Sequence, residues 1–350
     1  MLFNSLQFLF FLPLVFFLYW GIKERKAQNL LIVVASYVFY GWWDWRFLLL
    51  IALTSVCSYL SGIYIDRRPQ HGRQLMVLNL LFNLGILGVF KYYNFFAENF
   101  SLLLHTVGLK TDLPTLNIIL PVGISFYTFQ ALSYTIDVYR RQLRATTDPV
   151  EFFAFISFFP QLVAGPIERA TNLLPQFPRP RTVDYDKATD GLKQMLWGFF
   201  KKIVVADSCA LGVENIFSNY PSMSGGLLFL GGVLFAFQIY GDFSGYSDIA
   251  IGTARLFGID LMRNFNIPYF SRNISEFWSR WHISLTTWFR DYIYIPLGGN
   301  REGRLRTLRN TLIVFLVSGI WHGANWTFVC WGLYHALLII VFFLLGVRRQ

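Results

Sequence analysis

Two histidines stand in polar, aromatic motifs within otherwise apolar stretches, and His322 is the more deeply placed of the two. It lies in "SGIWHGANW", residues 318–326, directly after the apolar run "LIVFLV". An α-helix from Arg309 would place His322 roughly 20 Å further along, deep in a hydrocarbon core about 30 Å thick. A neutral imidazole with a free nitrogen is a base, so His322 is a candidate proton acceptor. The alternative is a structural hydrogen bond between helices, the role that we assign to His335 because it has no polar neighbours in "WGLYHALLII".

The second histidine, His282, lies in "SEFWSRWHISLTTWFRDYIYIPLGGNREG", residues 275–303. Charged and aromatic residues are mixed along this segment, so a helix formed by it has no clean side to turn to lipid. We predict a helix that lies in the membrane interface or lines a cavity. The alternative is an interfacial amphipathic helix with no chemical role. The residues concerned are Trp278, Arg280, Trp281, Trp288, Phe289, Arg290 and Asp291.

Two carboxylates follow an apolar run in "FQIYGDFSGYSDIAIG", residues 237–252. Asp242 and Asp248 near membrane depth can bind a cation, relay protons or pair with an arginine such as Arg290. An ion pair is the commonest fate, because a buried carboxylate needs a partner.

The elements that must position these residues are membrane helices. Hydrophobic residues make up 55% of the chain and charged residues only 14%, against about 25% charged residues in soluble domains. The basic residues behind the net charge of +10 fall in short loops, which indicates membrane topology rather than nucleic-acid binding. Because a spanning helix needs about 20 mostly apolar residues, the clearest predicted spans are roughly residues 5–21, 28–42, 47–64, 75–96, 117–138, 226–240 and 326–346.

Other segments are shorter or interrupted. "FFPQLVAGPIER", residues 158–169, contains two prolines and a glycine that break a helix, and it predicts a re-entrant turn surrounded by protein or water. Gly241 and Gly245 are spaced for the close approach of another helix. Lys201 and Lys202 are expected to extend toward the cytoplasmic surface.

The distribution of basic residues predicts orientation. Lysine and arginine concentrate in the first, third and fifth loops, whereas the fourth loop has only Lys110 besides Lys91 at a predicted helix end. These odd loops are therefore expected to be cytoplasmic and the N-terminus outside. No repeat and no long polar tract divides the chain, so we predict a single membrane-embedded domain over residues 1–350.

Several chemistries lack their usual motifs. The sequence has no P-loop, no GxGxxG, no GxSxG, no HExxH and no metal-ligand pair at helical spacing. Cys57, Cys209 and Cys330 are isolated among apolar residues and are expected to be packing residues. We expect no metal and no bound cofactor.

Three motifs, "FSGYSDIAIG", "WSRWHISLTTWFRDYIYIPLGGNR" and "SGIWHGANW", resemble in order and separation those of the membrane-bound O-acyltransferase family. The nearest branch looks like the bacterial alginate O-acetylation and teichoic-acid D-alanylation proteins. The resemblance extends upstream through "SFYTFQALSYTIDVYRR" and "FISFFPQLVAGPIER". It implies an all-α polytopic transmembrane fold, a ring of tilted helices around a thin centre with a central tunnel. Members usually continue beyond this point, so we expect a shorter member lacking the last C-terminal helices, or a ring completed from elsewhere.

The resemblance also implies an activity and a site. An O-acyltransferase of the bacterial inner membrane would move an acetyl group from cytoplasmic acetyl-CoA toward an exported polysaccharide, directly or through an extracytoplasmic acyltransferase partner. By this resemblance His322 is catalytic and His282 is its companion across the site. We expect His322 to take the proton of the acceptor hydroxyl, and His282, Asn325 or Trp321 to stabilise the oxyanion. The residues predicted to line the tunnel or bind substrate are Trp321, Asn325, Trp281, Arg290, Asp291 and Asp242.

The donor's charged nucleotide is expected to dock on a cytoplasmic basic surface. That surface is supplied by Arg301, Arg304, Arg306 and Arg309. Their alternative explanation is the preference for positive charge on the cytoplasmic side alone.

Two other functions are compatible with parts of the sequence. A proton-coupled transporter or flippase would use Asp242, Asp248 and His322 as a relay, but it predicts inverted repeats that are not visible. A non-catalytic membrane scaffold would recruit a partner and tolerate replacement of both histidines.

Overall fold

The prediction of an all-α fold is confirmed by a computed structural model, which describes residues 1–109, 113–116, 118–163 and 165–346. Within these residues every regular element is helical. The α-helices are Leu6–Gly21 (α1), Arg25–Gly41 (α2), Phe47–Arg67 (α3), Gly72–Leu87 (α4), Tyr93–Thr106 (α5), Ile124–Tyr139 (α6), Pro149–Ser157 (α7), Phe159–Leu162 (α8), Ala170–Leu173 (α9), Tyr185–Phe199 (α10), Asp207–Ser218 (α11), Gly225–Leu256 (α12), Ile274–Arg280 (α13), Ile283–Phe289 (α14), Arg304–His322 (α15) and Trp326–Leu344 (α16).

Shorter helical turns interrupt or extend these helices. Three are π-helical, Gly88–Tyr92 (η2), Phe200–Ala206 (η4) and Arg290–Tyr294 (η7). Four are 3₁₀ turns, Pro69–His71 (η1), Leu174–Gln176 (η3), Tyr220–Ser222 (η5) and Pro268–Phe270 (η6).

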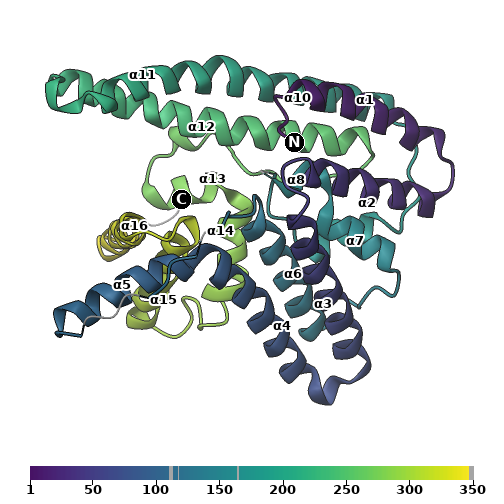
Figure 1. The fold of residues 1–350 in the computed structure, drawn as a ribbon, viewed down its shortest axis with the longest axis horizontal. Helices are drawn as coiled ribbons and strands as arrows, with labels where there is room; N and C mark the ends of the chain where they lie inside the picture. The colour runs from purple at the N-terminus through teal and green to yellow at the C-terminus, as the bar shows by residue number, and fades with distance from the viewer. Residues whose placement is uncertain (110–112, 117, 164, 347–350) are drawn as a thin grey trace.

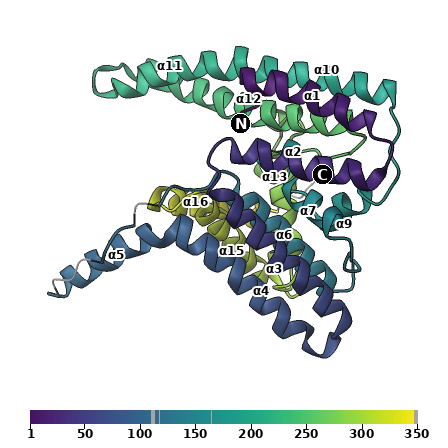
Figure 2. The same cartoon turned by 45° about the vertical axis from the view of Figure 1, so that its right-hand side comes forward.

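The helices form three neighbouring groups (Figures 1 and 2). Helices α10, α11 and α12 form a long hairpin across one end of the molecule, with α1 beside it. Helices α3, α4 and α6 pack together with α7. Helices α13 to α16 form the third group, in which α15 and α16 are an antiparallel pair, and α5 projects away from the body in both views.

Four helical segments in the described part of the chain are long and apolar enough to cross a membrane. They are Phe47–Arg67, Pro69–Thr106, Gly225–Leu256 and Trp326–Leu344. Helix α1 and the segment Pro149–Leu162 are apolar but shorter. Most side chains of these windows lie on the outside of the molecule, which suits a surface that faces lipid tails. The chain is therefore an integral membrane protein.

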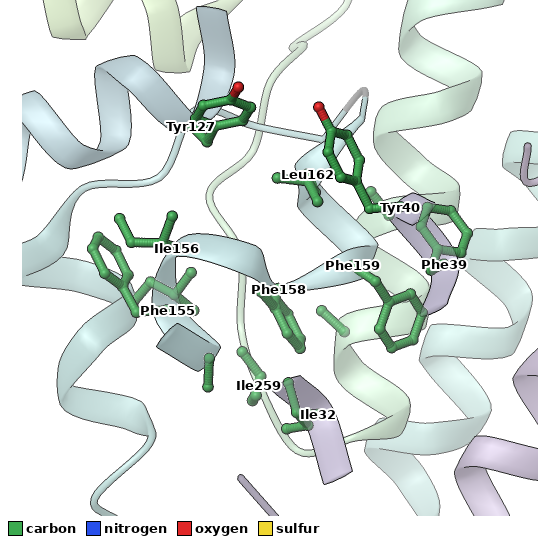
Figure 3. Packing of buried hydrophobic residues seen from close by; sticks show 14 of the residues in the cluster. Ile32, Phe39, Tyr40, Tyr127, Phe155, Ile156, Phe158, Phe159, Leu162 and Ile259 are labelled. Carbon is green, nitrogen blue, oxygen red and sulfur yellow. The ribbon is translucent and has the colours of Figure 1, made fainter. Parts of the chain in front are cut away.

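The main hydrophobic core lies where α2 packs against the short consecutive helices α7 and α8. Figure 3 shows aromatic and branched side chains from α2, α6, α7, α8 and the segment after α12 meeting in one cluster. The rings of Phe39 and Phe159 have centroids 5.5 Å apart, and Phe159 meets Phe257 at 5.7 Å. Within the described residues 158–163 and 165–169, the chain forms the short helix α8 and then a turn, and most of these residues are buried in protein, as predicted. At the start of α8, the buried Phe159 amide donates to Ser36 Oγ of α2 at 3.0 Å.

Helix α12 differs from the expected short span. The prediction of a span over residues 226–240 was too short, because the helix continues through the polar segment to Leu256. The continuation packs against α10 and η4, where a Cβ at Gly245 would lie 2.8 Å from the Gly198 carbonyl oxygen. The expected close approach at Gly241 and Gly245 is thus confirmed, and it keeps the polar residues inside a helical hairpin.

Candidate active site

A cavity of about 770 Å³ runs along one whole face of α15. The residues of α15 that line it recur every three or four positions, so a single stripe of the helix faces the space. From Arg304 to His322 this stripe is about 27 Å long at 1.5 Å per residue. The opposite walls come from α13, α14 and α16. The α15 stripe consists of Arg304, Thr307, Leu308, Thr311, Val314, Phe315, Ser318 and His322.

The two predicted histidines both line this cavity. His322 is the last residue of α15 and is exposed at the cavity. Its ring centroid lies 4.9 Å from that of Trp331 and 4.9 Å from that of Trp321. The ring of His282 lies 5.9 Å from the same Trp321 ring. A motif on α15 and a motif 40 residues earlier therefore meet around one indole.

Close packing of α15 on α16 fixes the position of His322. At the crossing, a Cβ on Gly319 would overlap the Phe328 carbonyl oxygen, and a Cβ on Gly332 would overlap the Phe315 carbonyl oxygen. Small residues allow this contact between backbones. The crossing lies one turn before His322, so it sets the height at which the imidazole enters the cavity.

His282 interrupts the helix that the sequence predicted over residues 275–303. That prediction of one helix was wrong, because α13 ends at Arg280 and α14 begins at Ile283. Between them His282 adopts a left-handed conformation with φ of 43°, which costs about 1–3 kcal/mol for a residue with a Cβ. The side chain is 3% exposed, and its Nε2 atom has no hydrogen-bond partner in the described structure. Strain and an unpartnered buried nitrogen are features of a reaction site.

Asn264 holds the turn at His282. This residue is 1% exposed, and its carbonyl oxygen accepts the Ile283 amide at 2.9 Å. Its Oδ1 accepts the Ser284 hydroxyl at 2.8 Å, and its Nδ2 donates to Ser247 Oγ at 3.0 Å. Ser284 Oγ in turn accepts the Ile167 amide at 2.9 Å. One buried amide thus joins α12, the broken segment 158–169 and the two residues that follow His282.

A second apolar core supports the site from behind. The Phe129 ring of α6 stacks on Trp288 with centroids 4.1 Å apart, and it meets Trp321 at 5.8 Å. The Trp288 indole donates to the Phe129 carbonyl oxygen at 3.2 Å. Helices α6, α14 and α15 are therefore coupled through aromatic rings next to both histidines. The buried members of this cluster are Phe129, Leu132, Ile167, Leu285, Trp288, Phe289 and Trp321.

The two carboxylates of α12 are engaged elsewhere. Asp242 pairs with Lys202 at 2.6 Å, and Asp248 pairs with Lys201, whose ammonium also donates to Ser244 Oγ at 3.0 Å. The expected ion pairs are confirmed, although the partners are Lys201 and Lys202 rather than an arginine such as Arg290. Neither carboxylate is among the residues that line the cavity in the described structure. They close the hairpin of α10, η4 and α12 rather than forming a relay to His322.

The remaining predicted site residues divide by position. Trp281 lines the cavity, and Trp321 lies between the two histidines with an indole nitrogen that has no partner in the described structure. Arg290 pairs with Asp291 at 2.6 Å, and Asp291 also pairs with Arg169 at 2.8 Å. These two residues do not line the cavity in the described structure.

Asn325 is also occupied. Its Oδ1 accepts the Thr327 amide at 2.9 Å and so caps the start of α16. His335, which we assigned a structural role, packs among Trp278, Trp331 and Tyr334. The structure adds residues that sequence reasoning missed, above all Asn264 and the stripe of α15, because their importance depends on contacts distant in sequence.

The far end of the cavity is basic. Arg304 lines it, and its guanidinium donates to the Leu344 carbonyl oxygen at 3.4 Å and lies 5.9 Å from the Phe343 ring centre. Of the neighbouring arginines, Arg306 pairs with Glu302, and Arg309 donates to the Leu297 carbonyl oxygen at 3.3 Å. The cavity thus joins a cationic end to an end with two imidazoles.

Comparison with known proteins matches this arrangement to a family. A sequence profile of the membrane-bound O-acyltransferase family matches residues 29–349. A probable alginate O-acetylase of Azotobacter vinelandii is 44% identical over 345 residues, which are 97% of this chain and 68% of the relative. A peptidoglycan O-acetyltransferase of Helicobacter pylori is 38% identical over 97% of this chain and 70% of its own length. A teichoic acid D-alanyltransferase of Streptococcus thermophilus is 28% identical over 83% of this chain and 75% of its own.

Proposed function

Because this chain belongs to the membrane-bound O-acyltransferase family and is an O-acyltransferase, we propose that it transfers an acetyl group from a cytoplasmic thioester to an exported polysaccharide. The transfer is direct or passes through an extracytoplasmic acyltransferase. One observation carries the proposal. A single cavity has His282 and His322 at one end and Arg304 at the other, about 27 Å apart along α15.

The acceptor is a hydroxyl of a surface carbohydrate polymer. The relatives are named for alginate, peptidoglycan and teichoic acid, and those with the higher identity are named for alginate. O-acetylation is therefore proposed over D-alanylation. The proposed extracytoplasmic partner would hold the polymer at the outer face of the membrane.

The donor is acetyl-CoA, entering at the basic end. A nucleotide carrying several phosphates is too polar for the hydrocarbon core, whereas its thioester arm is thin and flexible. Arg304, which lines this end of the cavity, provides positive charge for the phosphates, and the exposed Arg301 precedes it by three residues in the chain. In this proposal the start of α15 lies on the cytoplasmic side of the bacterial inner membrane, where an excess of basic residues is expected.

His322 acts as the general base. Its neutral imidazole takes the proton of the acceptor hydroxyl while the oxygen forms a bond to the thioester carbonyl carbon. The tetrahedral oxyanion collapses, the carbon–sulfur bond breaks, and the departing thiolate takes the proton from the imidazolium. General-base assistance of this kind contributes about 10²- to 10⁴-fold in rate.

His282 is proposed as the oxyanion donor. Its Nε2 is buried without a partner in the described structure and belongs to a residue that lines the cavity. A donor fixed in advance stabilises charge that appears in the transition state. Trp321 Nε1 is the second candidate, because it too is buried and unpartnered. Asn325 is withdrawn as a candidate because it does not line the cavity in the described structure.

The test replaces each histidine in the purified protein in lipid nanodiscs. Transfer of radiolabelled acetyl from acetyl-CoA to the polysaccharide exported by the same cells is measured. His322→Ala is expected to lower kcat by at least 10²-fold. His335→Ala is the matched control, because it also removes an imidazole from the aromatic cluster, and it should keep kcat within a few-fold. A folded His322→Ala protein with normal transfer would refute the proposal.

A further inference from the structure

A positive charge lies inside a membrane-spanning helix at Lys91. The residue belongs to η2 within the continuous segment Pro69–Thr106. It stands about 22 Å from the nearer end of that segment at 1.5 Å per residue. Its ammonium turns inward to the end of α15, where it donates to the Trp321 carbonyl oxygen. An ionisable residue in such a place indicates a function, and its partner identifies that function.

The ammonium of Lys91 has neutral partners only in the described structure. It donates to the carbonyl oxygen of Trp321 and to Ser125 Oγ, the latter at 3.3 Å. No carboxylate of the described residues forms an ion pair with it. It also lies 5.4 Å from the centre of the Trp321 ring. Lys91 therefore contacts the residue directly before His322 in two ways.

These contacts complete the end of α15. The last carbonyl groups of a helix have no partner within the helix. Tyr92 donates its hydroxyl to the Ile320 carbonyl oxygen at 2.9 Å, and Lys91 donates to the next one, that of Trp321. A cation also complements the negative end of the helix dipole, which lies at His322. The π-helical turn η2 brings two consecutive side chains onto adjacent carbonyls, and such turns occur frequently at functional sites.

Helix packing alone does not account for the lysine. The crossing at Gly319 and Gly332 already holds α15 against α16. A tyrosine hydroxyl already satisfies one terminal carbonyl without the cost of placing a charge at membrane depth. A charge-assisted hydrogen bond is shorter and about twice as strong as a neutral one, so it restricts the last peptide more tightly. The peptide so restricted is the one that leads into His322.

We propose that Lys91 is a positioning residue for His322. It holds His322 at the end of the cavity by donating a hydrogen bond to the Trp321 carbonyl oxygen. The inference rests on the proposed role of His322 as the base. Replacement should lower kcat, because a base displaced by about 1 Å loses much of its effect. The affinity for acetyl-CoA should not change, because the basic end of the cavity at Arg304 lies at the opposite end of α15.

The experiment compares Lys91→Met with Lys91→Arg in nanodiscs, using radiolabelled acetyl-CoA and the exported polysaccharide of the same cells. Lys91→Met is expected to lower kcat at least ten-fold with the KM for acetyl-CoA within two-fold. Lys91→Arg keeps a cationic donor and should recover at least a third of the lost kcat. Lys91→Gln keeps a neutral donor and should lie between the methionine variant and the native protein.

Three results would overturn the inference. They are a folded Met variant with kcat within two-fold of native, an effect confined to KM, and unfolding of both the Met and Gln variants. Unfolding of both variants would show that Lys91 stabilises the fold rather than positioning His322. His322→Ala in the same assay separates this inference from the proposed function. If His322→Ala is inactive while Lys91→Met is native-like, only the role of Lys91 fails, whereas an active His322→Ala rejects the base itself.

Discussion

Replacement of Asn264 by leucine is expected to lower both the stability of the protein and its kcat. Leucine fills a similar volume but offers no polar atom to Ser284 or Ser247. The two shorter side-chain hydrogen bonds are lost at about 0.5–1.5 kcal/mol each, together with a longer one from the Ser284 amide at 3.4 Å. The Ser284 hydroxyl oxygen still accepts the Ile167 amide. Its O–H group, however, is left buried without an acceptor, which costs about 1–3 kcal/mol. The free energy of unfolding should fall by about 2–6 kcal/mol.

The effect on catalysis comes from the strain at His282. A left-handed backbone costs about 1–3 kcal/mol and persists only while its surroundings hold it. Loosening Ser284, two residues further on, releases that strain and lets the imidazole leave the cavity. At 1.36 kcal/mol per factor of ten, the population of the native turn falls about 5- to 150-fold, and kcat should fall with it.

The assay combines thermal unfolding of the nanodisc-embedded protein with acetyl transfer measured well below the midpoint. Ser247→Ala is the matched control, because it removes one partner of Asn264 and leaves the contact to Ser284 intact. It should cost about 1 kcal/mol and keep kcat within two-fold. An Asn264→Leu protein that is destabilised but fully active would contradict the view that the strained turn at His282 serves catalysis.

Two further predictions concern α15. Gly332→Ala adds a Cβ that overlaps the Phe315 carbonyl oxygen, so it should destabilise the protein by about 1–3 kcal/mol in thermal unfolding. Gly232→Ala meets nothing within 4 Å and should not destabilise it, and equal effects of the two would contradict the tight crossing. Thr311→Trp fills the cavity midway and should raise the KM for acetyl-CoA at least ten-fold while Thr311→Ser leaves it near native. An unchanged KM in the tryptophan variant would exclude this route for the donor.

The membrane-spanning helices follow from local composition and were predictable. A long apolar run forms a helix in lipid whatever its distant contacts are. The predicted span 47–64 therefore matches Phe47–Arg67, and the predicted span 326–346 matches Trp326–Leu344. Where polar residues interrupt an apolar run, composition alone no longer predicts whether the segment is helical. The 237–252 segment stays helical because lysines of η4 neutralise its carboxylates.

The details of the site depend on contacts between distant residues, which no local pattern reports. His282 breaks a helix because Asn264, 18 positions earlier, accepts the Ile283 amide. Lys91 was placed at a helix end because a charge in an apolar run normally marks one, yet its partner is the carbonyl of Trp321, 230 residues away. The two histidines were found from sequence since imidazoles between apolar runs stand out.

The most direct test is a structure of the protein in nanodiscs with a thioether analogue of acetyl-CoA, which cannot release its acetyl-like group. The cavity along α15 should hold the analogue with its phosphates near Arg304. Its acetyl-like carbon should lie within about 4–6 Å of the His322 ring, leaving space for an acceptor oxygen in contact with both. An analogue bound outside this cavity, or one whose reactive end stops far from His322 and His282, would contradict the account.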